Sequence, residues 1–447
     1  MLSPFMRGQG ERPLKITFHI SSLANATGET LAALQTLREL GYVAEITAYQ
    51  TEPGDFPHIV IGDNNVNFQD NTIPVRLIVN GEAQLYTGII FPRHLPQLAG
   101  LLAKETNIDT KTILEDLLVA EAHIQVGGDI FITSSNLLLK HRHKEFIGNA
   151  NPREPEEAAQ IVGLFLRTHD IYTYSAGKNY KLNCDRGGFY WILARHRLPS
   201  MWRYFSGCLH AGQIVGDYLQ ELGESILIRA VRALEARDAI GTMFYMPQNN
   251  NIRDQIMYHF DYLTLVLAGA LDAQARIARR AYHVEGEERY ASFRDKKFRQ
   301  TLERKGALEL MNVINDPQFD SYLLLLYRLR NTIHGPAMKA IAYQSSGDPE
   351  ITLVEVPKNI QPVLWANAEQ CGTPEEWGLK REFPGMMLEP YSYATNLVKF
   401  GLSTLDKIAA ATDVTRLFPA GSQIPTLTEA EPNDQIWRWA SRISLLG

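Results

Sequence analysis

The chain lacks the features that mark secreted, disulfide-bonded and membrane-spanning proteins. Its 3 cysteines, Cys184, Cys208 and Cys371, lie far apart and form no CxxC pair. A sparse, odd set of cysteines excludes a disulfide framework and indicates a reducing compartment. No apolar run approaches the roughly 20 residues of a membrane span, and the first residues contain no apolar stretch typical of a secretory signal. We therefore expect a cytoplasmic protein with no membrane partner.

Strong charge of one sign and the motifs of several enzyme classes are also missing. The 447 residues carry a net charge of −6, so any contact with nucleic acid must come from a local basic patch. The sequence has no P-loop, no GxGxxG after a predicted strand and no GxSxG. In Lys140–Lys144, His141 and His143 supply only two ligands and no cysteine lies nearby, which favours a solvated basic loop over a metal site. We expect no metal or other cofactor.

Alternating strand and helix patterns predict an α/β domain with a largely parallel sheet over residues 14–170. Short apolar or alternating segments are expected to be strands at Lys15–Ile20, Tyr42–Tyr49, His58–Ile61, Val75–Val79, Gln84–Phe91 and Asp129–Thr133. Helical periodicity is expected at Ser22–Gly41, His94–Thr106, Thr110–Val126 and Pro155–Thr168. Residues 1–13 are expected to be a loose tail.

Helical periodicity dominates the rest of the chain. It predicts a connector at 171–200, a mostly α-helical bundle domain at 201–415 with a small β-hairpin insertion, and a C-terminal tail at 416–447. The helices are expected at Tyr218–Asp238, Arg253–Val284, Phe293–Val313, Asp316–His334 and Tyr391–Ala410. The hairpin is expected at Lys339–Gln344 and Ile351–Val356. Trp437 and Trp439 are expected to dock the tail.

The segment that ends at His334 joins an apolar helical stripe to polar groups. Its members, spaced three or four residues apart and so expected on one helix face, are Phe319, Leu323, Leu326, Arg330 and His334. A cation and an imidazole that close an apolar stripe need a partner, because an unpaired buried charge is costly. That partner is a neighbouring residue, another subunit or a ligand phosphate.

The sequence RNTIH at 330–334, within a predicted helical bundle, resembles the HEPN superfamily. The signature of that family is an arginine, usually followed by a polar residue, and then a histidine after four to six intervening residues. Asn331 matches the polar position and His334 the histidine. Three residues separate Arg330 from His334, whereas five separate Arg328 from it. The resemblance covers about residues 200–415 and implies a dimeric α-helical domain, in many members a metal-independent endoribonuclease.

The residue types of the motif suit cleavage of RNA without a metal ion. A base must remove the proton of the 2′-hydroxyl group, and histidine titrates near neutral pH. An arginine can donate two hydrogen bonds to the scissile phosphate. We take Arg330, Asn331 and His334 as catalytic candidates, and the resemblance implies a homodimer that sets two such groups around one phosphate. Alternatively, these residues cap the helix before Gly335, where cationic side chains interact favourably with the helix dipole.

A basic stretch with interleaved aromatic residues runs from residue 276 to residue 305. The RNA-binding candidates from this stretch and from the motif are Arg276, Arg279, Arg280, Lys296, Lys297, Arg299 and Arg328. The alternative is an ordinary solvated helix face.

Parts of the first domain resemble the second half of PIN-like nuclease domains, which cluster acids at strand ends around Mg²⁺ or Mn²⁺. The matching segments are Glu115–Asp116, Asp129–Thr133 and Pro155–Thr168. The first strand of a PIN domain normally carries an aspartate, whereas KITFHISS here contains no acid. The resemblance therefore implies a degenerate PIN-like domain used for binding or dimerisation.

These observations support one function and leave two alternatives. The first is a cytoplasmic homodimer that cuts or binds RNA in a stress or defence system of the toxin or anti-phage type. The second is a non-catalytic dimerisation or binding module with a protein partner or regulator. The third is a metal-dependent nuclease centred on the acids of the first domain.

Overall fold

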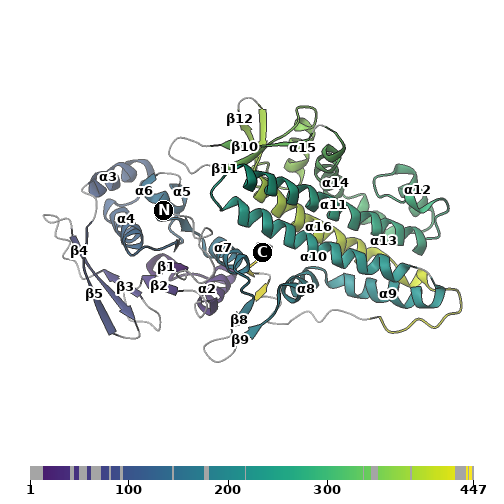
Figure 1. Cartoon of the computed structure of the whole chain (residues 1–447), viewed down its shortest axis with the longest axis horizontal. Coiled ribbons are helices and arrows are strands. Elements are labelled where there is room, and N and C mark those ends of the chain that lie inside the picture. Colours follow the sequence, from purple (N-terminus) through teal and green to yellow (C-terminus); the bar gives the residue numbers. More distant parts are fainter. Residues whose placement is uncertain are drawn as a thin grey trace.

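The computed structural model describes residues 14–40, 45–49, 58–61, 72–79, 82–90, 94–142, 145–175, 181–216, 218–335, 337–343, 351–382, 385–427, 439–440 and 442–444. The expected tail at residues 1–13 lies outside these ranges. Within them the chain is mostly helical, with one larger sheet near the N-terminus and smaller antiparallel sheets further along. The sheet with its helices lies at one end of the molecule and the helical bundle at the other (Figure 1).

A seven-stranded sheet organises the first part of the chain, in the order β5-β4-β3-β2-β1-β6-β7. The strands are β1 (Lys15–His19), β2 (Glu45–Tyr49), β3 (His58–Ile61), β4 (Thr72–Val79), β5 (Glu82–Ile90), β6 (Ile130–Ile132) and β7 (Pro152–Arg153). From β3 to β7 all neighbouring strands are parallel, and β4 and β5 add an antiparallel edge. The prediction of an α/β region with a largely parallel sheet is confirmed, whereas the finer PIN-like assignment stays a prediction.

Helices cover both faces of the central strands β1 and β6, so that almost all of their residues are buried, polar Thr17 and His19 included. Ile130 and Ile132 face one apolar core together with α2 (Gly28–Leu40) and α7 (Pro155–Thr168). Phe131, between them, faces a second core. The helices of that second core are α3 (Leu95–Thr106), α4 (Thr110–Gln125), α5 (Asn136–Lys140) and α6 (Glu145–Gly148). A short helix, α1 (Ile20–Leu23), follows β1 directly.

Long helices form the bundle at the other end of the molecule (Figure 1). They are α8 (Arg186–Arg197), α9 (Pro199–Val215), α10 (Leu219–Phe244), α11 (Asn250–Ala281), α14 (Pro317–Arg330) and α16 (Pro390–Ala411). The helices α10 and α11 pack against each other along their length, and α16 packs on both. On α11, Ile256, Phe260, Leu263 and Leu267 recur at helical spacing and are buried, as expected for an inner face. A mostly helical second part is confirmed, and the HEPN assignment stays a prediction.

The expected connector at 171–200 is instead built into the bundle. It contains a hairpin of β8 (Thr173–Ser175) and β9 (Lys181–Asn183) followed by α8. Phe189, Tyr190 and Leu193 of α8 are buried in the main apolar core. Asp185 caps α8 by accepting a hydrogen bond from the Gly188 amide at 2.6 Å, so the CDRGG turn begins a helix.

Two further expectations need correction. The single helix expected at Phe293–Val313 is two helices, α12 (Lys296–Arg304) and α13 (Leu308–Ile314), because Gly306 between them adopts a left-handed φ of 79° that ends the first. The expected hairpin is confirmed as β10 (Lys339–Tyr343) and β11 (Ile351–Glu355), but it belongs to a four-stranded sheet. The additional strands are β12 (Leu379–Glu382) and β13 (Gly385–Leu388), which follow α15 (Gln361–Gln370). Short 3₁₀ turns, η2 (Glu288–Tyr290) and η4 (Val414–Leu417), complete this part.

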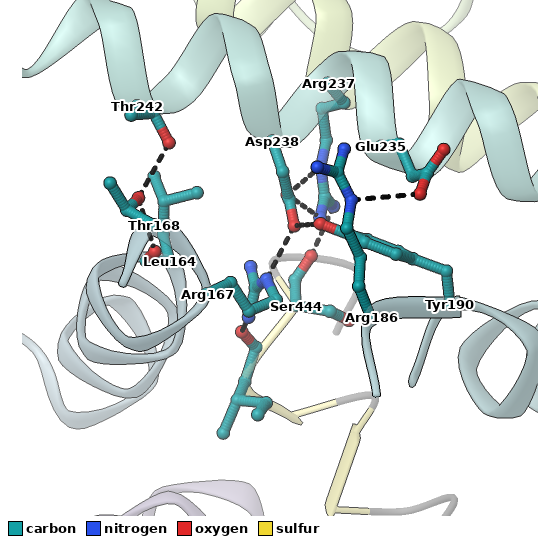
Figure 2. Close-up of polar contacts among 11 residues, drawn as sticks. Leu164, Arg167, Thr168, Arg186, Tyr190, Glu235, Arg237, Asp238, Thr242 and Ser444 are labelled. Atoms are coloured by element: carbon teal, nitrogen blue, oxygen red, sulfur yellow. Dashed lines mark hydrogen bonds and ion pairs between the residues drawn. The ribbon is translucent and has the colours of Figure 1, made fainter. Parts of the chain in front are cut away.

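A buried ionic network joins α7 of the sheet region to α8 and α10 of the bundle (Figure 2). Asp238 accepts hydrogen bonds from Arg167 Nε at 2.6 Å and from the Tyr190 hydroxyl at 2.8 Å. Arg237 donates to the other oxygen of the same carboxylate from Nε at 3.0 Å. Burial alone raises the pKa of Asp238, but Arg167 and Arg237 outweigh it and hold that pKa below its usual value.

The C-terminal segment adds main-chain acceptors to this network. The main-chain oxygens of Ile443 and Ser444 accept hydrogen bonds from Arg167 and Arg237. Trp439 is buried and meets the Phe189 ring edge to face, with centroids 6.0 Å apart. The expected docking of the tail through Trp439 is confirmed, and Trp437 lies outside the described residues.

Candidate functional site

The predicted motif lies at the end of α14, where the helix type changes. α14 ends at Arg330, and Asn331–His334 forms a 3₁₀ turn, η3. The expectation of one α-helix through His334, with Arg330 and His334 on the same face, is therefore wrong. A 3₁₀ helix has three residues per turn, so side chains three apart stand above one another.

Three exposed side chains lie at this junction three residues apart, Arg328 at the end of α14 and Asn331 and His334 in the 3₁₀ turn, and we call them the ridge. All three are exposed, whereas Leu329 beside them is buried. Among the residues that the structure describes, neither Arg328 nor His334 has a hydrogen-bond or ion-pair partner. His334 is thus exposed, and unpaired among the described residues, at the same junction as Arg328, the arginine whose distance along the sequence matches the HEPN signature.

Arg330 lies between the ridge and the body of the bundle. It is partly buried, and its Nε is enclosed without a partner among the described residues. Its Nη1 lies 3.4 Å from Asn331 Oδ1, a weak contact. The end of α14 is capped by Thr332, whose hydroxyl donates to the Leu329 carbonyl at 2.6 Å. Thr332 thus provides the side-chain hydrogen bond at this helix end that was expected of Asn331 or His334, while the cations of the motif stay near the negative end of the helix dipole.

Tyr327 connects the motif to α11. Its hydroxyl donates to Asp272 Oδ1 at 3.0 Å, and the Arg294 guanidinium lies 4.3 Å from the centre of its ring. Burial and the neighbouring Asp272 raise the pKa of Tyr327, while Arg294 and Arg330 lower it. The phenol therefore stays protonated, and Asp272 is engaged by it as an acceptor.

The predicted RNA-binding residues fall into two groups. Arg279, Arg280 and Arg299 are engaged in the protein: with the Gly286 carbonyl, with Glu288 and with Asp320, respectively. Arg276 is half-buried on α11, and Lys296, Lys297 and Arg328 are exposed. These four have no ion-pair partner within the described ranges. Because the other three are engaged within the protein, fewer of the predicted basic residues are available to a ligand than the sequence suggests.

The ridge is a surface feature and does not line the pocket found in this part of the bundle. That pocket lies at the other end of α14 and is lined by residues that include Asp316, Phe319, Phe400 and Lys407. No group of three or more histidines, cysteines and acids is arranged to hold a metal ion in the described ranges.

A second polar cluster lies at the carboxyl ends of β1 and β6. His19 Nδ1 is 3.0 Å from Thr133 Oγ1, and His19 Nε2 is 3.7 Å from Asp116 Oδ1. Burial lowers the pKa of His19 from 6.5 to about 4, so the imidazole is neutral. Burial raises the pKa of Asp116, while Ser135, which donates a hydrogen bond to it, lowers the pKa. His19 and Thr133 are almost fully buried and close the strand ends, whereas Asp116 and Ser135 beside them are partly exposed.

The acids expected in a PIN-like arrangement do not converge. Asp116 lies near the carboxyl end of β1, whereas Asp129 accepts a hydrogen bond from the Lys15 amide at its amino end, at 2.7 Å. Glu115 is exposed and forms an ion pair with Lys111. These three acids lie too far apart to share one metal ion and therefore do not support the metal-nuclease alternative.

No helix in the described ranges is both long and apolar enough to cross a membrane. The comparisons with known proteins give no relative: no family model, no curated protein and no solved structure matches this chain. The function is therefore inferred from the ridge and its surroundings.

Proposed function

We propose that the protein is an endoribonuclease that cleaves single-stranded RNA at the ridge and needs no metal ion for the chemistry. The observation that carries the proposal is the joint exposure of Arg328, Asn331 and His334 at the end of α14. Unpaired, solvent-facing cationic and imidazole groups are available to a phosphodiester.

The chemistry assigns a role to each group. His334 removes the proton of the RNA 2′-hydroxyl, and the 2′-oxygen attacks the adjacent phosphorus. The bond from phosphorus to the 5′-oxygen breaks, that oxygen takes up a proton, and the products carry a 2′,3′-cyclic phosphate and a 5′-hydroxyl. Arg328 stabilises the charge on the phosphate, with Arg330 beside it, and Asn331 donates a hydrogen bond from its amide.

We propose further that the active form is a homodimer and that the helical part is HEPN-like. A single ridge supplies one histidine, which cannot be both the base and the acid in one step. A second ridge facing the first would supply the other proton-transfer group. A role in stress or defence agrees with an RNA-cutting activity but is carried by the HEPN resemblance alone.

The test is cleavage of a mixed panel of single-stranded RNAs by the full chain and by His334→Ala. We expect cleavage by the wild type and a loss of at least a hundredfold in the variant, since general base catalysis contributes about 10² to 10⁴. His334 is exposed, so the variant should melt within about 1 °C of the wild type. Equal cleavage by both proteins would contradict the proposal.

A further inference from the structure

An arginine cluster lies where α10 and α11 pack together, next to the helix that bears the ridge. On α10, Ser225, Arg229 and Arg232 lie on one face because they are four and three residues apart. On α11, Gly269, Asp272 and Arg276 share a face for the same reason. The Arg229 guanidinium crosses to α11, where a Cβ on Gly269 would lie 3.1 Å from its Nε. Gly269 thus makes room for Arg229.

The positive charges of this cluster are only partly offset by acids of the described residues. Arg229 donates a 2.8 Å hydrogen bond to the Ser225 hydroxyl, which carries no charge. Its pKa is lowered by burial and by the neighbouring charges of Arg276 and Arg232, against a smaller opposing effect of Asp272. Within the described part of the chain, Arg229, Arg232 and Arg276 form no ion pair with an acid.

The acid that acts on Arg229, Asp272, has a hydrogen-bond partner of its own. Asp272 accepts the hydrogen bond of the Tyr327 hydroxyl from α14. Arg294 covers the Tyr327 ring, and Arg330 is one helical turn further along α14. Positive groups from both sides therefore surround one occupied carboxylate, although the whole chain has a net charge of −6. Such local excess charge is expected where a polyanion binds.

We propose that Arg229, Arg232 and Arg276 bind the sugar-phosphate backbone of single-stranded RNA and lead it to the ridge. This inference rests on the proposed function and names where its substrate binds. The basic groups of the cluster are guanidiniums, which bind phosphate oxygens through two parallel hydrogen bonds. Tyr327 joins the two sites, since it contacts Asp272 in the cluster and precedes Arg328 of the ridge in the sequence. In this proposal, a strand held on the cluster continues past the end of α14 to His334.

The experiment measures binding apart from cleavage. Fluorescence anisotropy of a labelled single-stranded RNA is recorded with His334→Ala protein, with and without Arg229→Ala, Arg232→Ala and Arg276→Ala together. We expect the Kd to rise at least tenfold, and the slope of log Kd against log salt to fall by about 2, since each phosphate contact on a single strand contributes about 0.7. The matched control replaces exposed basic residues elsewhere, Lys104, Arg203 and Lys358, by alanine, and should change the Kd less than twofold.

A second variant, Arg232→Glu, separates loss of binding from loss of folding, because Arg232 is exposed and its replacement leaves the core intact. It should weaken RNA binding at least threefold while the melting temperature stays unchanged. Unchanged RNA affinity in both cluster variants would overturn the inference. The inference would also be overturned if the cluster variants bound RNA like the wild type and lost only the ability to bind vesicles of phosphatidylserine and phosphatidylcholine. If cleavage requires His334 but the cluster variants bind RNA as tightly as the wild type, only this inference fails. If binding requires the cluster but no RNA is ever cut, only the nuclease proposal fails.

Discussion

Arg167 Nε lies 2.6 Å from Asp238 Oδ2, and this pair joins α7 of the sheet region to α10 of the bundle. Both side chains are almost fully buried, with exposed fractions of 2% and 5%. Arg237 uses the same carboxylate, and Arg197 nearby has its pKa lowered to about 10 by burial and by the charge of Arg237. Asp238 is therefore the carboxylate on which several buried guanidiniums depend (Figure 2).

Asp238→Ala should destabilise the protein by roughly 3–5 kcal/mol, because it leaves buried arginines without their counter-charge. The free energy of unfolding is measured by urea denaturation. The matched control is Glu235→Ala on the same helix, which breaks the exposed pair with Arg186 and should cost less than about 1 kcal/mol. Equal losses in the two variants would show that the network does not hold the two parts together.

The stability of the protein should fall as the pH decreases from about 6.5 to 4. Burial holds the pKa of His19 at about 4, so in this range the unfolded chain binds a proton that the folded chain does not, and acid favours unfolding. The penalty from His19 is zero well above pH 6.5 and reaches about 3 kcal/mol below pH 4.

The check on His19 is urea denaturation at pH 7 and pH 4.5 for the wild type and for His19→Gln. The loss between the two pH values should be smaller in the variant. His334→Ala, which removes an exposed imidazole, should keep the full loss. An identical pH dependence in all three proteins would refute the assignment of His19 as a buried neutral imidazole.

Gly163→Ala should loosen the C-terminal segment. A Cβ at this position would lie 2.2 Å from the Ile443 carbonyl oxygen, closer than any real contact. We expect a loss of about 1–3 kcal/mol, as for other overpacked sites, together with a change in the fluorescence of buried Trp439.

The control for Gly163 is Gly100→Ala in the middle of α3, where a Cβ meets nothing within 4 Å. That change should leave stability unchanged or raise it by up to about 1 kcal/mol, because alanine favours a helix. A tolerated Gly163→Ala would mean that the tail does not pack on α7.

Much of the fold was predictable from periodicity. The alternating apolar segments around Ile16 and the helical stripe of α11 directly gave the sheet and the inner face of the bundle. Two segments without a strong period were not predicted. The strand β7 (Pro152–Arg153) has only two residues. The helix α8 begins in a Gly-rich turn, although Asp185 at its start is a residue type that often caps helices. Gly306 also marked a helix end, since a left-handed residue terminates a helix.

The site was predicted in composition but not in geometry. Helical spacing put Arg330 on one face with His334, whereas the helix changes to a 3₁₀ turn after Arg330, and the sequence contains no clear signal for that transition. The arginine cluster needed the packing of α10 on α11, which brings Arg229 and Arg276 together across more than 40 positions. In the sequence, the arginine cluster is visible only as basic residues at helical spacing on α10. That pattern is common on solvated helices as well.

The most direct test of the central claim is the chemistry of the RNA ends produced by wild-type protein in the presence of a metal chelator. If the ridge acts as proposed, the 5′ fragments end in a 2′,3′-cyclic phosphate, and neither these ends nor the cleavage appears with His334→Ala. Cleavage that stops on chelation, or that leaves 3′-hydroxyl ends and persists in the variant, would show that the ridge is not the catalytic site.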